Sequence, residues 1–273
     1  MTSSFNVTAI GYSHINSKMP CQDFSASYSD RERTIITACD GHGGKVYIRS
    51  QRGSKFASEA ILRAMLDIES LSFRKYTPEE IEHKLKLDIL CEWNELVKRD
   101  LKKHPIRKGE LKALNEVQIE ALRQNPTRAY GTTLGGAMLY GGRLICVGLG
   151  DGGCYLLKNG DIKSAFEEDE DEPVANFTYS MCGEDAFEHM RASIFDFRSF
   201  DGIMLCTDGV LAPYASLENL KKSFVRPTVK LVLENKIKNI KGFIYDLGAK
   251  SGVGDDVSLA MILKDNMSQK YYR

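Results

Sequence analysis

The 273-residue chain lacks several features that would assign it to a special class of protein. Its 37 Lys and Arg residues balance 37 Asp and Glu residues, which argues against a general nucleic-acid-binding protein, since such proteins carry a basic excess. No apolar run approaches the roughly 20 residues that span a bilayer. The N-terminal residues contain no positive region followed by an apolar stretch, so we expect neither a signal peptide nor a membrane partner.

Cysteine pairs and linkers are also missing. The seven cysteines are odd in number, and no two of them form a Cys-x-x-Cys motif. Several lie in apolar runs, where cysteine behaves as a small buried hydrophobic residue, so we expect a reducing compartment and a cytoplasmic location. Because the chain has no internal repeat and no Pro- or Ser-rich linker, we expect one monomeric domain over residues 1–264 and a tail over residues 265–273.

The sequence does contain many short β-type runs separated by helical stretches. Their hairpin-like connections are typical of antiparallel sheets and predict the α+β class. Residues 13–22 have the composition of a polar loop, and Pro227 is expected to break a helix. We predict strands at residues 5–12, 23–28, 34–39, 132–140, 143–149, 154–158, 161–163, 192–197, 202–207 and 257–263, and helices at 46–66, 77–101, 110–123 and within 216–247.

One stretch joins a strand to chemically active side chains. The β-branched run at residues 34–39 ends in Asp40, Gly41, His42 and two further glycines. Three glycines in four positions let the backbone turn sharply and approach a ligand closely. A carboxylate and an imidazole at a strand end suggest metal-assisted hydrolysis. The alternative is an ordinary Gly-rich turn from strand to helix, with the aspartate as a helix cap.

The same pattern, an apolar β-run that meets an acid beside glycine, occurs four times, at Asp40, Asp151, Asp208 and Asp255. Carboxylates gathered at one pole of a sheet would repel one another unless cations bound between them. Oxygen ligands suit Mg²⁺ or Mn²⁺, and no His/Cys cluster with zinc spacing competes. Two such ions, about 3.5–4 Å apart, activate a shared water for displacement at phosphorus. The pattern therefore predicts a two-metal phosphoester hydrolase, and its alternative is four unrelated turns.

Short motifs in register resemble those of the metal-dependent serine/threonine protein phosphatases of the 2C type, the PPM family. The resemblance extends over residues 11–263 and includes an opening motif, Pro20-Cys21-Gln22-Asp23, in a form like that of bacterial members. It implies an α-β-β-α fold, in which two antiparallel sheets form a sandwich flanked by helices and the metals lie in a cleft at one end. The other motifs are at residues 40–44, 131–133, 150–152, 207–209 and 254–258.

The resemblance also implies roles for the strand-end residues as ligands of Mn²⁺ or Mg²⁺. Asp40 would bridge two ions, and the Gly41 carbonyl would bind one of them. Asp208 and Asp255 would hold one ion, and Asp151 together with Asp208 matches the position that binds a third, weaker ion. The expected partner is a phosphorylated protein that a serine/threonine kinase has modified.

The remaining implied residues would handle the substrate and the water. Asp23 would hydrogen-bond metal-bound waters, and His42 would act as the general acid, a task that suits the near-neutral pKa of histidine. Lys18 lies where many members have a phosphate-binding arginine, and it lacks the bidentate fork of that side chain. His14 is a second candidate for phosphate contact. Gln22 stands where the family often has glutamate.

Two other functions remain open at this point. A catalytically weak relative would sense phosphorylated partners, and the lysine at position 18 is compatible with that role. A phosphatase of a small phosphorylated metabolite would use the same metal chemistry. The run of six acids at residues 167–172 predicts a solvated loop, and specificity is expected in the irregular segment at residues 167–190, where the family has a variable flap.

Overall fold

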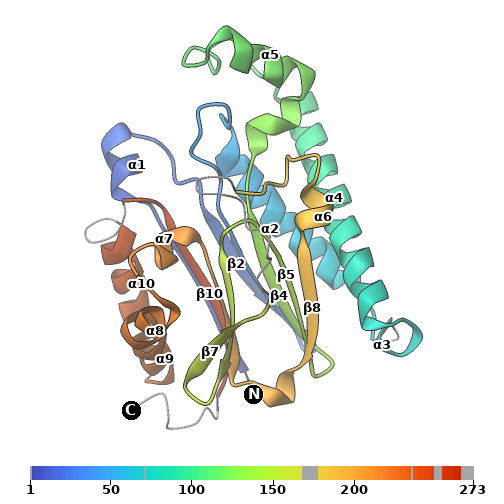
Figure 1. Ribbon diagram of the computed structural model, residues 1–273, viewed down its shortest axis with the longest axis vertical. Helices are drawn as coiled ribbons and strands as arrows, with labels where there is room; N and C mark the ends of the chain where they lie inside the picture. The colour runs from blue at the N-terminus through green and yellow to red at the C-terminus, as the bar shows by residue number, and fades with distance from the viewer. Residues whose placement is uncertain (1, 71, 168–177, 235, 249–253, 266–273) are drawn as a thin grey trace.

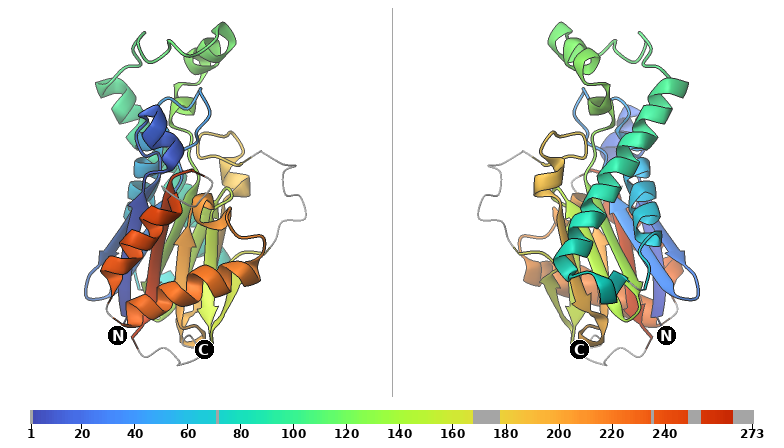
Figure 2. Two further views of the ribbon diagram at one scale, coloured as in Figure 1. Left: turned by 90° about the vertical axis from the view of Figure 1, so that its left-hand side faces the viewer. Right: turned by 90° about the vertical axis from the view of Figure 1, so that its right-hand side faces the viewer.

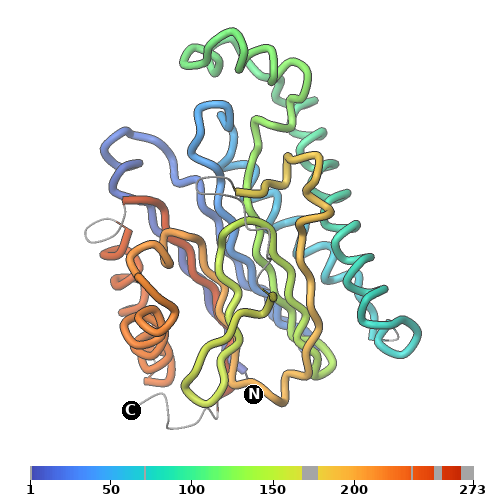
Figure 3. Tube along the Cα trace, viewed as in Figure 1, coloured from blue at the N-terminus to red at the C-terminus, as the bar shows by residue number. Residues whose placement is uncertain are grey.

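The computed structural model describes residues 2–70, 72–167, 178–234, 236–248 and 254–265. Figures 1 and 3 show two sheets in the middle of the molecule, with helices on both outer sides. Most of the acidic run, much of the flap-like segment and nearly all of the expected tail lie outside the described residues.

Within the described residues, ten strands form two five-stranded sheets in which all pairings are antiparallel. The first sheet has the order β1 (Thr2–Ala9), β10 (Val257–Lys264), β9 (Gly202–Cys206), β6 (Gly153–Lys158) and β7 (Asp161–Ser164). The second has the order β2 (Phe24–Ser29), β3 (Arg33–Cys39), β4 (Leu134–Tyr140), β5 (Arg143–Leu149) and β8 (Arg191–Asp196).

Helices cover the outer face of each sheet, so the predicted α-β-β-α fold is confirmed (Figure 2). The second sheet carries α2 (Ser50–Leu66) and α4 (Pro78–Lys103), and the first carries α7 (Asp208–Leu211), α8 (Leu217–Leu220), the π-helical turn η3 (Lys221–Val225), α9 (Arg226–Leu233) and α10 (Ile237–Asp246). Shorter elements connect them: α1 (Tyr12–Ser17), α3 (Ser72–Lys75), α5 (Glu116–Gln124), η1 (Pro126–Tyr130), α6 (Ala186–His189) and η2 (Phe197–Ser199).

The central strands are apolar on both sides because each sheet is buried on both faces. In β3, Ile35 packs in the cluster under the helices, whereas Ile36 packs between the sheets. In β10, Met261 faces the C-terminal helices and Ile262 faces the other sheet. The period-two alternation of a strand thus builds three apolar layers from continuous hydrophobic runs.

Tertiary contacts explain two of the local predictions that were wrong. Residues 13–22 are not a loop throughout, since α1 begins at Tyr12; a buried carboxylate described below holds both ends of this segment. The predicted helix at 110–123 begins only at Glu116, because Asn115 caps it in a reciprocal capping box with Gln118. Glu110, at the predicted start, is bonded to Arg49 instead.

Pro227 does not break the helical region in which it lies. The turns of α8, η3 and α9 follow one another without interruption from Leu217 to Leu233. Pro227 occupies the first turn of α9, where its missing N–H is least costly. The predicted irregular segment before β8 also contains the short helix α6.

Candidate metal and phosphate site

Antiparallel pairing brings three strand-end aspartates to one end of the first sheet. Cys206, the last residue of β9, pairs with Gly153 at the start of β6 and with Leu259 near the start of β10. Asp151 precedes β6, Asp208 follows β9 and Asp255 precedes β10. The three carboxylates therefore lie on neighbouring connections, although they are 47 or more residues apart in the sequence.

The second sheet contributes two more carboxylates at the same end of the sandwich. Cys39 pairs with Phe24, so Asp40 after β3 lies beside Asp23 before β2. A hydroxyl joins the two sheets here, since Thr207 Oγ1 donates to Asp23 Oδ2 over 2.7 Å. All five aspartates that the sequence singles out are thus brought together.

The backbone around Asp40 is held by the threonines of the 131–133 motif. Thr132 Oγ1 and Thr133 N donate to the Asp40 carbonyl oxygen over 2.7 and 2.8 Å, and Asp40 N donates to Thr133 Oγ1. Gly41 N donates to the Gln22 carbonyl, and a Cβ at position 41 would lie only 2.7 Å from that oxygen. Glycine is therefore required for the strand end to approach this loop so closely.

The carboxylates repel one another strongly. Burial raises the pKa of Asp40 well above its usual range, and the charges of the other four aspartates, Asp23 first among them, raise it further. Burial, with the charges of Asp151 and Asp255, raises the pKa of Asp208 to about 6. Burial also raises the pKa of Asp23, against the hydrogen bond from Thr207. The charged neighbours that raise these pKa values are all acids, so a bound cation would stabilise the ionised carboxylates.

Hard divalent cations fit this donor set because every side-chain donor is a carboxylate oxygen. No three His, Cys, Asp or Glu side chains among the described residues are arranged to hold an ion as they stand. The charge of the cluster and its oxygen donors indicate a metal site, although the side chains are not already arranged around an ion. Asp40, Asp208, Asp255, Asp151 and Asp23 are the residues that meet this requirement.

His42 lies at the same strand end, and one of its ring nitrogens has no hydrogen-bond partner within the described residues. Its ring lies 4.9 Å from the ring of Tyr47, and the backbone N–H of His42 donates to the Gly131 carbonyl. Its Nε2 atom is buried and has no hydrogen-bond partner among the described residues. Burial lowers the pKa of His42, and the charge of Asp151 opposes this shift. The side chain is thus an oriented imidazole whose outer nitrogen is available to a ligand.

The two candidates for phosphate contact differ in their surroundings. Lys18 ends α1 in the left-handed region, with φ of 56°. Its side chain is exposed and makes no hydrogen bond or ion pair within the described parts of the chain. His14 is buried, and its Nδ1 atom lies 2.9 Å from Asp256 Oδ2. Lys18 thus has an ammonium without a partner among the described residues, whereas Asp256 engages one ring nitrogen of His14.

Asp256 is the residue that sequence reasoning missed. Its carboxylate is 2% exposed and accepts from Gly11 N over 2.7 Å, from Gln22 N over 2.5 Å and from His14. Gln22 in turn accepts from Gly41 N, so one carboxylate ties α1, the loop before Asp23 and the Asp40 turn together. The only signal in the sequence was the doubled acid, Asp255-Asp256, directly before β10.

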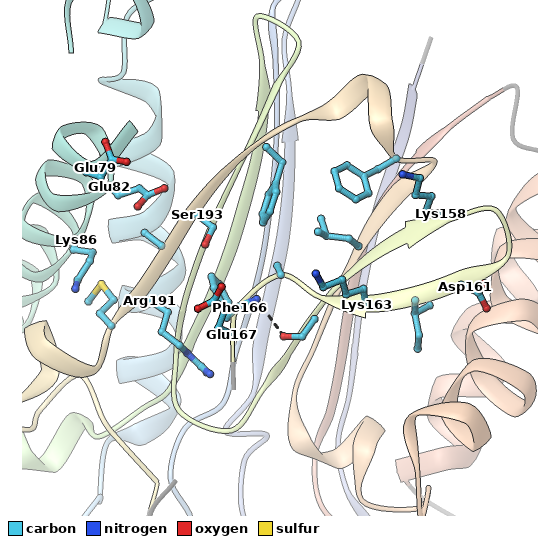
Figure 4. A pocket seen from close by; sticks show the side chains of 18 of the residues that line it. Glu79, Glu82, Lys86, Lys158, Asp161, Lys163, Phe166, Glu167, Arg191 and Ser193 are labelled. Atoms are coloured by element: carbon cyan, nitrogen blue, oxygen red, sulfur yellow. Dashed lines mark hydrogen bonds between the residues drawn. The ribbon is translucent and has the colours of Figure 1, made fainter. Parts of the chain in front are cut away.

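A wide groove lies away from the carboxylate cluster. A groove of about 990 Å³ runs between α4 and strands β6, β7 and β8, with Lys86, Lys163 and Arg191 on its walls (Figure 4). None of the five aspartates lines it. A cavity of about 360 Å³ includes Asp151 and Tyr214. The larger of these two cavities therefore lies apart from the carboxylate cluster, and the smaller one reaches it at Asp151.

The sequence profile of one family, protein phosphatase 2C, matches residues 10–243. The chain belongs to the protein phosphatase 2C family. This membership confirms the predicted family and enzyme class, a serine/threonine phosphatase. No curated protein matches the chain.

Solved structures share the fold of this protein phosphatase 2C chain at low identity. A bacterial serine phosphatase is 15% identical with a TM-score of 0.60, over 98% of this chain and 100% of its own. The Mycobacterium tuberculosis phosphatase PstP/Ppp is 15% identical with a TM-score of 0.57, over 97% and 99%. The catalytic domain of PstP in complex with two manganese ions is 15% identical with a TM-score of 0.54, over 96% and 97%.

Among the helices of the described residues, none combines the length and the apolar composition that a membrane span requires.

Proposed function

We propose that this protein removes phosphate from phosphoserine and phosphothreonine in proteins, with a water activated by two Mn²⁺ or Mg²⁺ ions. The observation that carries the proposal is the like-charged carboxylate cluster around Asp40, in which burial and then the charges of the neighbouring aspartates raise the pKa values of Asp40 and Asp208. The manganese-bound structure of the relative PstP supports the choice of metal. Family membership supports the choice of reaction.

The proposed ligands are the residues at the strand ends. Asp40 and the Gly41 carbonyl would hold two ions between them, with Asp208 and Asp255 on one ion and Asp151 with Asp208 on a third. Bound divalent cations supply an activated water and neutralise charge on the phosphoryl oxygens. Asp23 would accept hydrogen bonds from waters at the site while Thr207 keeps it in place.

His42 and Lys18 act on the substrate in this proposal. The buried Nε2 of His42 would carry the proton that the serine or threonine oxygen takes up as it leaves. The exposed ammonium of Lys18 would contact the phosphate as a point charge. The expected substrates are proteins that a serine/threonine kinase has phosphorylated. All seven cysteines are free thiols, which supports a reducing, cytoplasmic location, and we expect a monomer.

Hydrolysis of p-nitrophenyl phosphate and of a phosphoserine peptide, with Mn²⁺ or with EDTA, tests this function. Both activities should require the metal and should fall by at least about 10³ in Asp40→Asn. Asp67→Asn is the matched control, because Asp67 is exposed at the far end of α2. Turnover that survives EDTA or Asp40→Asn would contradict the two-metal proposal. Metal binding without turnover would favour a phospho-sensor, and hydrolysis of small phosphomonoesters alone would favour a metabolite phosphatase.

A further inference from the structure

A strongly basic segment follows the middle of α4. Between residues 98 and 112 the chain carries seven Lys or Arg residues and only two acids, although the whole protein is neutral. Six of these cations are exposed and have no ion pair within the described residues. We call them the basic face: Arg99, Lys102, Lys103, Arg107, Lys108 and Lys112.

The two acids of the segment are turned inward and neutralised by α2 and its N-cap. Asp100 accepts from Arg52 Nη1 over 2.7 Å and from the Tyr130 hydroxyl over 2.6 Å. Glu110 accepts from Arg49 Nε and Nη2 over 2.8 and 3.0 Å. The cations on the outside are therefore left without counter-charges among the described residues.

Arg49 also fixes the segment beside the candidate site. Its guanidinium donates to the carbonyl oxygens of His104 and Pro105 over 2.7 and 3.2 Å. Arg49 is seven residues after His42, on the loop that leads from the Asp40 turn into α2. In Figure 1 the end of α4 and α5 lie above the sandwich, at the end where this loop and α1 lie. The segment that carries the basic face thus lies at the same end of the sandwich as the Asp40 turn.

Helix stability accounts for only part of the basic face. Lys102 and Lys103 lie in the last turn of α4, where a cation gains about 0.3–1 kcal/mol from the helix dipole. Arg107, Lys108 and Lys112 lie beyond the helix and gain nothing from it. Arg99 shares a side of the helix with Lys102 and Lys103, at spacings of three and four, where like charges repel. An acidic partner would relieve this repulsion.

We propose that the basic face docks an acidic or further phosphorylated segment of the protein substrate, next to the phosphoserine that enters the carboxylate site. This inference rests on the proposed function. Acidic or phosphorylated side chains beside the phosphoserine carry charge that the exposed cations of the basic face can attract. Electrostatic steering by such a surface raises association rates by about 10–10³, and added salt weakens it.

The test compares Lys103→Glu/Lys108→Glu/Lys112→Glu with a matched variant, Lys230→Glu/Lys238→Glu/Lys241→Glu. The second set consists of exposed lysines on α9 and α10, over the other sheet. Three substrates are compared: p-nitrophenyl phosphate, a phosphoserine peptide with neutral flanks, and one with acidic flanks. The first variant should lower kcat/KM at least about tenfold for the acidic peptide and less than about twofold for the other two. The second variant should leave the wild-type preference intact.

Salt and binding measurements complete the test. The wild-type preference for the acidic peptide should disappear between about 20 mM and about 500 mM salt, as the Debye length shortens. Equal losses on all three substrates, or none, would overturn the proposal. If no substrate turns over, the proposed function fails by itself, and fluorescence anisotropy of the labelled acidic peptide still tests docking. Tighter binding of RNA or anionic vesicles at this face would also overturn it. If a Lys→Glu variant does not fold, the variant with Lys→Gln at the same three positions is used in its place.

Discussion

Replacing Asp208 by asparagine should stabilise the metal-free protein. Asp208 has its pKa raised from 3.8 to about 6 by burial and by the charges of Asp151 and Asp255. At neutral pH the folded protein must hold this carboxylate ionised against that penalty. Asparagine keeps the size of the side chain and one acceptor oxygen, and it removes the charge.

The raised pKa of Asp208 sets the expected gain in the free energy of unfolding. About two pKa units at 1.36 kcal/mol each give an upper limit near 3 kcal/mol. Because Asp208 is partly exposed and solvent screens its charge, we expect about 1–2 kcal/mol. For a chain of this length that corresponds to a rise in Tm of about 2–6 °C.

At saturating Mn²⁺ the wild-type protein should be more stable than Asp208→Asn, the reverse of the metal-free order. A ligand at 100 times its Kd stabilises the folded state by about 2.7 kcal/mol, and Asp208→Asn should lose most of this gain together with a ligand. The assay is thermal unfolding at about pH 7.5 in EDTA and in Mn²⁺, with Asp67→Asn as the control. A metal-free Asp208→Asn protein that is less stable than wild type would refute the argument, because it would mean that the cluster is not repulsive.

Three further predictions follow from the same site. Metal-free stability should fall as pH rises from about 4 to about 7 in urea titrations, because a carboxyl with a raised pKa binds more protons in the folded than in the unfolded state; a rise would contradict this. His42→Ala should slow an alkyl phosphate about 10²–10⁴-fold but p-nitrophenyl phosphate far less, since nitrophenolate leaves without a proton; equal losses would exclude His42 as the acid. Asp256→Ala should cost about 3–5 kcal/mol and Asp256→Asn clearly less, measured by chemical unfolding, because alanine leaves three buried donors unpaired; equal costs would deny the hydrogen-bonding role.

The helices that differ from prediction are those whose limits depend on distant residues. The capping box of α4, with Thr77 and Glu80, can be read locally, and that helix begins where predicted. The start of α5 depended on whether Glu110 would join a helix, and its bonds to Arg49, 61 residues away, decided otherwise. The helix α1 has no local cap from a side chain, and its fixed point is Asp256, more than 240 positions further along.

The sequence by itself determined the strands, the kinds of donor and the places where the strands end. Alternating β-branched runs specify strands through side-chain packing alone, and an acid beside glycine at each strand end can be seen without coordinates. It did not determine that Asp23, Asp40, Asp151, Asp208 and Asp255 share one pole, since that follows from antiparallel pairing in two different sheets. The repulsion among these carboxylates depends on how close together they lie and how deeply each is buried. Only the tertiary structure therefore shows that the five acids need bound cations. Likewise, a run of lysines became a basic face only because Arg49 and Arg52 neutralise the acids among them.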